Sequence, residues 1–297
     1  MTAPLSIGLD AGGTKTALLA RSGSREVSLS GPGAHALRDG AEGAADRLAE
    51  LVREACREAG GAPAARVVAG VAGAGREAER AALQRAFAER LGAGVRVEVV
   101  HDAAIALDAA WGEGSGAVLV VGTGSVLFAR DEDGRTLRAG GWGHALGDDG
   151  SGTALGRAAL RAVLAAHDGG PPTALADAFA EQDLATPEAI LRAVYVADRP
   201  LASFAPTLLG AVDSGDWVAE QALMRETNAV GQQAVWLATR AAEAVSPRVA
   251  LVGGLVREAA YRQRLLAALE RHLPGWTVEP DPPPPVAGAL RRAEALT

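Results

Sequence analysis

The residues best suited to chemistry gather in a glycine-rich turn near the amino end of the chain. An apolar run from Ile7 leads to Asp10, and then come Gly12, Gly13, Thr14, Lys15 and Thr16 before apolar residues resume. Glycine lacks a Cβ, so we expect positive φ in this turn and backbone N–H groups that approach an anion such as phosphate. The hydroxyls and the lysine add further anion contacts. A carboxylate beside such a turn is explained by Mg²⁺ between it and the phosphate, which makes Asp10 the candidate metal residue.

The turn is not a P-loop, because that motif runs from a strand into a helix and this one runs into a second strand. A glycine hairpin that binds no ligand remains the alternative. Lys15 is the only lysine in the chain, yet we rank it as an auxiliary phosphate contact behind Asp10 and the glycines.

A second carboxylate follows a strand expected at residues 95–100. There His101-Asp102 precedes an alanine-rich helix expected at 103–110. In open α/β sheets ligands collect at the carboxyl ends of strands, which places Asp102 well for chemistry. A helix N-cap is the alternative role, and the two roles are compatible.

The second half of the chain repeats the opening pattern. A strand at 116–121 leads into Gly122, Thr123, Gly124 and Ser125, and a strand at 126–130 follows. Two such turns predict a duplicated fold with a cleft in which both face one ligand. Later, Gly253 and Gly254 end a buried strand and open a helix expected around 259–272, which suits an adenosine or an α-phosphate.

Residues 140–152 are the most glycine-dense segment of the chain, and ordering so many glycines costs backbone entropy. We expect a ligand or the other domain to order them. Gly141 and Trp142 could line a sugar site, although simple packing of the tryptophan is the commoner role. Of Asp148 and Asp149, one is expected to cap the helix at 151–166 and the other to point into the cleft.

Composition narrows the function classes. The 297 residues are 48% apolar and 22% charged, as in globular proteins. A net charge of −7 provides no basic field for nucleic acid, and no apolar run is long enough to cross a membrane. We therefore expect a cytoplasmic protein. Cys56 is the only cysteine, which excludes an intrachain disulfide and a Cys-based cluster within one chain.

The order of these motifs resembles that of the actin/hexokinase/Hsp70 superfamily. The segments Gly140 to His144 and Gly147 to Ser151 make the chain look like the BadF/BadG/BcrA/BcrD ATPase family, near its N-acetylglucosamine and glucosamine kinases. The resemblance implies two ribonuclease H-like (actin-like ATPase) α/β domains, at 1–110 and 111–297. A helical insertion is expected at about 155–245, and the closing helix at 286–297 could pack on the first domain.

The resemblance implies an ATP-dependent amino-sugar kinase acting at O6, in a homodimer. Asp102 matches the general base, Asp10 the Mg²⁺ carboxylate and Asp148 a sugar contact. The family's sugar-binding asparagine is replaced by Ala34-His35, so His35 becomes a candidate sugar contact. Glucosamine, N-acetylglucosamine, N-acetylmuramate and other hexoses all remain open as substrates.

Two other functions are compatible with the fold. Activator ATPases of 2-hydroxyacyl-CoA dehydratases and benzoyl-CoA reductases share a [4Fe–4S] cluster between subunits, which needs two cysteines from each, and this chain has one. A non-catalytic sugar sensor would be expected to lose the base or the metal carboxylate. Both Asp102 and Asp10 are present, which favours an enzyme.

Overall fold

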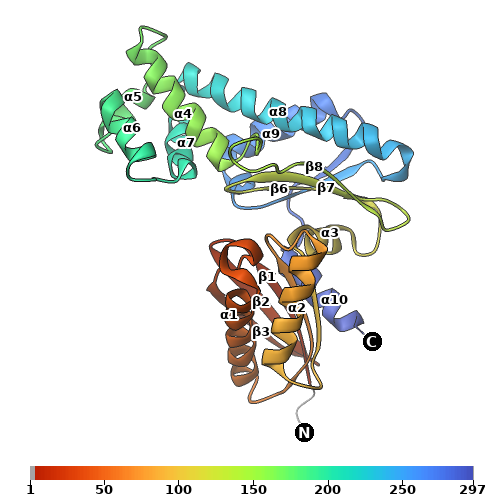
Figure 1. Cartoon of the computed structure of the whole chain (residues 1–297). Coiled ribbons are helices and arrows are strands. Elements are labelled where there is room, and N and C mark those ends of the chain that lie inside the picture. Colours follow the sequence, from red (N-terminus) through yellow and green to blue (C-terminus); the bar gives the residue numbers. More distant parts are fainter. Residues whose placement is uncertain (1–3, 297) are drawn as a thin grey trace. The chain divides into compact units, whose positions relative to one another are not determined.

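A computed structural model gives the fold of the chain and describes residues 4–296. These residues form two compact units, one made of residues 4–114 and 282–296, the other of residues 115–281. Each unit holds one five-stranded sheet (Figure 1). The predicted fold class, an α/β fold built on two such sheets, is confirmed. Among residues 4–296, no helix combines the length and apolar character needed to cross a bilayer.

The sheet of the first unit has the order β3-β2-β1-β4-β5. The first three strands form an antiparallel meander, β4 then adds in parallel to β1, and β5 adds in parallel to β4. The meander is the strand, glycine turn, strand pattern seen in the sequence, extended by one more strand. The strands are β1 (Leu5–Ala11), β2 (Lys15–Ser22), β3 (Arg25–Pro32), β4 (Ala64–Val71) and β5 (Arg96–His101).

Helices cover both faces of this sheet. Along β4, Val67 and Ala69 belong to a core shared with α1 and α2, whereas Val68 belongs to a core with α3 and α10. Successive side chains of a strand point to opposite faces, so the two cores lie on opposite sides of the sheet. The helices are α1 (Ala36–Glu58), α2 (Glu77–Leu91), α3 (Asp102–Trp111) and α10 (Pro285–Ala295).

Glycines let α10 lie close to its neighbours. A Cβ on Gly8 of β1 would fall 2.2 Å from the Leu290 nitrogen, and one on Gly288 would fall 2.1 Å from the Ile105 carbonyl oxygen of α3. The last helix of the chain therefore completes the fold of the first unit.

The sheet of the second unit repeats the topology, with the order β10-β9-β6-β7-β8. An antiparallel meander again comes first, one strand then adds in parallel to its first member, and a last strand adds in parallel to that one. The strands are β6 (Gly116–Val121), β7 (Ser125–Arg130), β8 (Thr136–Gly140), β9 (Arg248–Val252) and β10 (Thr277–Glu279).

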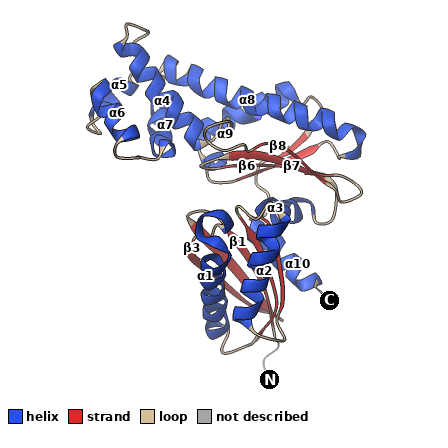
Figure 2. Ribbon diagram, in the orientation of Figure 1, coloured by secondary structure: helices blue, strands red, loops and turns tan. Residues whose placement is uncertain are grey.

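Between β8 and β9 the chain is helical, and α8 packs on β7 and β8 (Figure 2). Buried residues of α4, α7, α8 and α9 join the inner face of the sheet in one core. The elements are α4 (Gly152–His167), α5 (Leu175–Ala180), α6 (Pro187–Tyr195), η1 (Leu201–Phe204), α7 (Ala205–Asp213), α8 (Trp217–Ala241), η2 (Ala242–Ala244), η3 (Leu255–Arg257) and α9 (Ala259–His272).

Candidate active site

In the first unit, the predicted carboxylates lie at one edge of the sheet. Asp10 is the penultimate residue of β1 and pairs with Gly70 of β4, while Val71 of β4 pairs with His101, the last residue of β5. The carboxyl ends of parallel strands meet at the same edge, so Asp10 and Asp102 come together there. The effect of the Asp102 charge on the pKa of Asp10 reflects this proximity.

Asp102 is the first residue of α3 and not its cap. The N-cap is His101, and the Ala103 N–H lies 2.9 Å from Asp102 Oδ1 and 3.2 Å from His101 Nδ1. His101 Nδ1 lies 2.9 Å from Asp102 Oδ1. The Ala103 N–H and the His101 ring thus both lie within hydrogen-bond distance of the Asp102 carboxylate.

These contacts set the charge of Asp102. Burial alone would raise the pKa of its carboxyl, but the hydrogen bond and charge of His101, the Ala103 N–H and nearby His35 together lower it below the ordinary value. Asp102 therefore stays ionised, as a proton acceptor must.

The pKa of Asp10 is shifted in the opposite direction. Burial first and the Asp102 charge second raise the pKa of its carboxyl to about 6, although Lys15 partly offsets them. A cation beside Asp10 would reverse this shift, because it stabilises the charged form.

The Gly12 to Thr16 turn differs from expectation in its backbone. Neither Gly12 nor Gly13 has positive φ, so that prediction was wrong. The Gly12 N–H donates to the Lys15 carbonyl at 3.0 Å. Ideal Cβ atoms on the two glycines would come no nearer than 3.4 Å to any neighbour, so the chain leaves their outer side open. The Thr16 hydroxyl donates to the Pro32 carbonyl at 2.8 Å and supports β3.

The glycine that close packing requires in this region is Gly33, which follows β3. A Cβ there would fall 2.6 Å from the Gly13 carbonyl carbon, so the loop after β3 can press against the turn only with glycine at this place. The Gly33 N–H donates to the Thr14 carbonyl at 3.2 Å. This loop is therefore a second support of the glycine turn.

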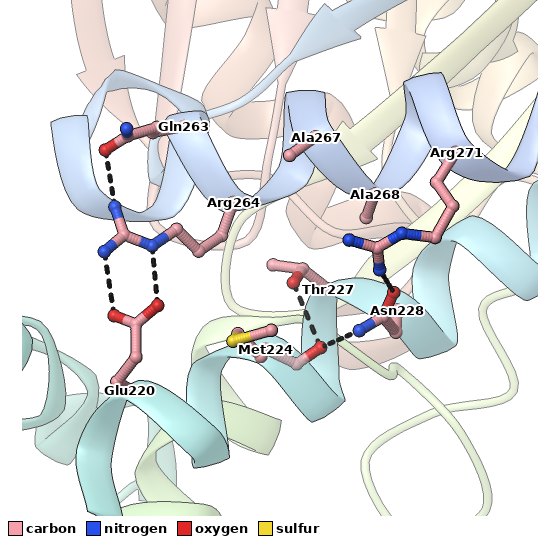
Figure 3. A pocket seen from close by; sticks show the side chains of 9 residues that line it. All are labelled: Glu220, Met224, Thr227, Asn228, Gln263, Arg264, Ala267, Ala268 and Arg271. Atoms are coloured by element: carbon pink, nitrogen blue, oxygen red, sulfur yellow. Dashed lines mark hydrogen bonds and ion pairs between the residues drawn. The ribbon is translucent and has the colours of Figure 1, made fainter. Parts of the chain in front are cut away.

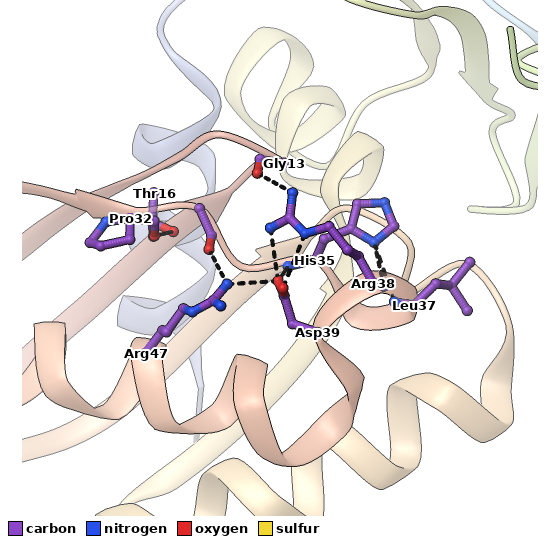
Figure 4. A network of polar contacts seen from close by, with 9 residues as sticks. Gly13, Thr16, Pro32, His35, Leu37, Arg38, Asp39 and Arg47 are labelled. Carbon is purple, nitrogen blue, oxygen red and sulfur yellow. Dashed lines mark hydrogen bonds and ion pairs between the residues drawn. The ribbon is translucent and has the colours of Figure 1, made fainter. Parts of the chain in front are cut away.

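Two arginines contact the glycine turn and the loop after β3, and both also contact the carboxylate of Asp39 (Figure 4). Arg38 donates to the Gly13 carbonyl at 2.5 Å, and Arg47 donates to the Gly33 carbonyl at 2.9 Å. Both guanidiniums contact Asp39 Oδ2 at 2.9 Å. The two arginines and the His35 N–H lower the pKa of Asp39 well below its usual range. No sequence pattern predicts this network, because its donors and acceptors lie up to 25 residues apart in the chain.

His35 acts as the N-cap of α1. Its Nδ1 accepts the N–H groups of Leu37 and Arg38 at 3.2 and 3.3 Å, while its own N–H donates to Asp39 at 2.8 Å. The helix therefore begins at Ala36, and it bends at Gly40. With Nδ1 as acceptor, Nε2 is the ring nitrogen that is left to contact a ligand.

In the second unit, the 122–125 turn is fixed by the start of α4. The Gly152 N–H donates to the Gly122 carbonyl at 2.8 Å, and the Thr153 N–H and hydroxyl both donate to the Thr123 carbonyl. The Ser125 hydroxyl donates to the Asp149 carbonyl at 2.6 Å. The carbonyls of this turn thus face α4.

Asp148 and Asp149 take different roles, and neither caps α4. The cap is Ser151, whose hydroxyl accepts the Ala154 N–H, so the predicted aspartate cap was wrong. Asp149 accepts the side-chain amide of Gln233. Asp148 has φ of 61°, and its Oδ2 would lie 3.0 Å from a Cβ on Gly124. The structure thus brings this aspartate to the 122–125 turn.

Trp142 is 67% exposed, so the packing alternative does not hold for it. The guanidinium of Arg138 lies over its ring at 4.8 Å from the centroid and also donates to the Gly141 carbonyl. One ring face is therefore covered by a cation.

Gly253 and Gly254 were predicted to open α9. They do not do so directly, because the 3₁₀ turn η3 lies between them and that helix. Gly253 follows β9 with φ of 121°, and a Cβ there would fall 2.0 Å from the Val121 carbonyl of β6. This glycine is required by close approach to the neighbouring strand.

A cavity of about 760 Å³ in the second unit lies between α4 and α8 and reaches Gly147 and Asp149, on either side of Asp148. Another, of about 250 Å³, lies on the α8–α9 seam (Figure 3). Its charged groups bind one another, with Arg264 on Glu220 and Arg271 on Asn228, and none of the predicted site residues lines it.

The chain is similar to a known family over almost its whole length, because the model of the BadF/BadG/BcrA/BcrD ATPase family matches residues 7–290. An N-acetylmuramic acid/N-acetylglucosamine kinase of Clostridium acetobutylicum is 31% identical over 227 residues, which are 73% of this chain and 74% of that one. An N-acetyl-D-glucosamine kinase of Dictyostelium discoideum is 36% identical over 38% of this chain and 36% of its own.

Solved structures share the fold. A candidate N-acetylglucosamine kinase from Chromobacterium violaceum superposes with a TM-score of 0.77 at 24% identity, covering 97% of this chain and 98% of that one. A ROK family glucokinase from Streptomyces griseus, in complex with glucose and AMPPNP, gives a TM-score of 0.60 at 19% identity and covers 98% of both chains.

Proposed function

The chain belongs to the BadF/BadG/BcrA/BcrD ATPase family, and from this membership we propose that it is an ATP-dependent kinase that phosphorylates an amino sugar at O6. The observation that carries the proposal is the Asp102 carboxylate, held ionised by His101 and Ala103 at the sheet edge that also bears Asp10 and the glycine turn. The relatives are named as kinases of amino sugars, which supports an amino sugar as the phosphate acceptor.

Asp102 is the general base of the proposed reaction. It accepts the proton of the attacking sugar hydroxyl, while His101 and the Ala103 N–H keep the carboxylate oriented. Phosphoryl transfer proceeds through a loose transition state, so placing the hydroxyl in line matters more than strong basicity. A pKa below the ordinary value is compatible with this role.

Asp10 would hold Mg²⁺. Among residues 4–296 no group of three or more His, Cys, Asp or Glu side chains could form a metal cage. One buried carboxylate next to a glycine turn fits a Mg²⁺ whose remaining ligands are phosphate oxygens and waters. When bound, the ion would neutralise charge on the phosphates. The turns Gly12 to Thr16 and Gly122 to Ser125 would bind those phosphates through backbone N–H groups other than those of Gly12 and Gly122, which donate within their own turns. Lys15 would be an added cation, and Gly253-Gly254 would lie near the adenosine.

The second unit would supply the sugar contacts through residues 141–148. Asp148 would accept hydrogen bonds from sugar hydroxyls, and Gly141 and Trp142 would form the adjoining wall. His35 of the first unit would be a further contact through Nε2–H. The carbonyl and the carboxylate of Asp149 are already bound by Ser125 and Gln233, which favours Asp148 as the residue that meets the sugar.

The proposal is tested by measuring ADP release from ATP and Mg²⁺ with a panel of glucosamine, N-acetylglucosamine, N-acetylmuramate and glucose. The product's phosphate position is read by NMR. We expect turnover with at least one amino sugar and a phosphate on O6. ATP hydrolysis that no sugar accelerates would contradict the kinase assignment, and a phosphate on another oxygen would contradict the regiochemistry alone.

A further inference from the structure

The long helix α8 reaches the proposed sugar segment with two polar side chains. Glu226 and Gln233 are seven residues apart, which is two turns, so they lie on the same side of the helix. Gln233 is buried, while its helical neighbours Val230, Ala234 and Leu237 belong to the core. A buried polar side chain is costly without hydrogen bonds, so its partners explain its presence.

Those partners are all in the segment 140–150. The Gln233 amide donates to the Asp149 carboxylate, and its Oε1 would lie 2.2 Å from a Cβ on Gly140. Glu226 Oε2 accepts the Gly150 N–H at 3.0 Å. One side of α8 therefore binds the end of the segment and lies against its beginning.

Asp148 lies between these attachments in a backbone conformation that is costly for a non-glycine residue. Such a conformation persists only when surrounding contacts determine it. The neighbouring Asp149 is bound through its carbonyl by Ser125 and through its carboxylate by Gln233, and Gly150 is bound by Glu226.

We propose that Gln233 and Glu226 are positioning residues, which hold the segment 140–150 so that the Asp148 carboxylate is presented to the sugar. This inference rests on the proposed function for its effect on catalysis, but the restraint of the segment can be measured without any substrate. The helical insertion thereby gains a part in sugar recognition that its sequence did not indicate.

The test uses the full chain with four variants. Gln233→Met keeps the length of the side chain and removes the amide, and Glu226→Ala removes the acceptor, whereas Glu226→Gln keeps an oxygen that can accept the Gly150 N–H. Tyr261→Phe is the matched control. Its hydroxyl is buried without a hydrogen-bond partner among the described residues and would lie 3.2 Å from a Cβ on Gly150, so it adjoins the segment without binding it.

The first readout is hydrogen exchange of the amides of residues 140–150 without ligands. We expect exchange about 10-fold faster in Gln233→Met and Glu226→Ala, and unchanged exchange in Glu226→Gln and Tyr261→Phe. Unchanged exchange in both loss variants would overturn the inference, whether or not the wild type phosphorylates a sugar.

The second readout is steady-state kinetics with the preferred sugar. We expect KM for the sugar to rise about 10-fold in the loss variants while KM for ATP stays the same, because only the sugar contact is displaced. Equal loss of affinity for both substrates would indicate general destabilisation and overturn the positioning role. Absence of turnover in the wild type would overturn the proposed function, while the exchange result would still stand.

Discussion

At the scale of single residues, the site depends on two carboxylates whose pKa values are shifted in opposite directions. Asp102 is kept ionised by donors at the start of α3, whereas burial and the Asp102 charge raise the pKa of Asp10 to about 6. Pairs of titratable groups whose environments separate their pKa values are typical of sites with divided roles. Here the separation matches a proton acceptor and a cation ligand.

Replacing the base gives the most direct prediction. Asp102→Asn keeps the shape of the side chain but cannot accept the sugar proton, so we expect kcat to fall by about 10² to 10⁴ while the Kd for ATP is unchanged. ADP release and calorimetric titration with a nucleotide measure the two quantities. Asp133→Asn is the control, because that aspartate lies in an exposed turn. Normal turnover by Asp102→Asn would refute the assignment of the base.

His101 provides a prediction about pH. His101→Asn retains a residue suited to capping but removes the imidazole that lowers the pKa of Asp102. A base works only when it is deprotonated, so activity is lost as pH falls through its pKa. We therefore expect the acid limb of the kcat/KM profile to move to higher pH in the variant. An acid limb that stays in place would show that another group controls it.

At the scale of elements, the start of α1 supports the first glycine turn. His35 caps the helix, and Asp39 holds the two arginines that bind the carbonyls of Gly13 and Gly33. The turn is thus positioned by loops and a helix end rather than by its own glycines. The same principle holds in the second unit, where the start of α4 binds the carbonyls of the 122–125 turn.

Asp39→Asn tests this support through pH. Because the folded-state pKa of Asp39 is depressed, its carboxylate stabilises the fold above its ordinary pKa, about 3.9, and that contribution is lost as pH falls below it. We expect the variant to unfold at lower urea than the wild type at pH 7. The two midpoints should converge as pH falls below about 4. A difference that is constant with pH would mean that the carboxylate charge is not responsible.

At the scale of the whole molecule, the last helix of the chain belongs to the same unit as the first strands. Residues 282–296 belong to the first unit although residues 115–281 precede them, and α10 packs on β1, β4 and α3. The first unit therefore cannot complete its core until the last helix has been made. This arrangement predicts that the contacts of α10 matter for the stability of the first unit.

Two glycine substitutions test that requirement. Gly288→Ala would place a Cβ 2.1 Å from the Ile105 carbonyl, so we expect the free energy of unfolding to fall by about 1–3 kcal/mol. Gly210→Ala in α7 is the matched control, because a Cβ there meets nothing within 4 Å. It should stabilise by about 0.4–1 kcal/mol. Urea unfolding followed by circular dichroism measures both, and equal effects would contradict the packing argument.

The sequence by itself determined the elements and the family. Apolar runs, glycine turns and helical periodicity are local signals, and they located β6 and α9 at their observed bounds. The order of the motifs predicted the duplicated sheet and the family membership. Asp10 and Asp102 stood out because carboxylates at the ends of buried strands have few structural reasons to be there.

Only the tertiary structure decided which groups hold these residues in place. Gly13 meets Arg38, Asp149 meets Gln233, and Gly150 meets Glu226, and in each pair the partners are far apart in the chain. A polar residue in a helical stretch gives no sign of the loop it will face, because that depends on how the helix packs. For the same reason Gly33, rather than Gly12 or Gly13, proved to be the glycine that crowding requires. The cap of α4 is instead a local contact, and there Ser151 rather than either aspartate takes the position.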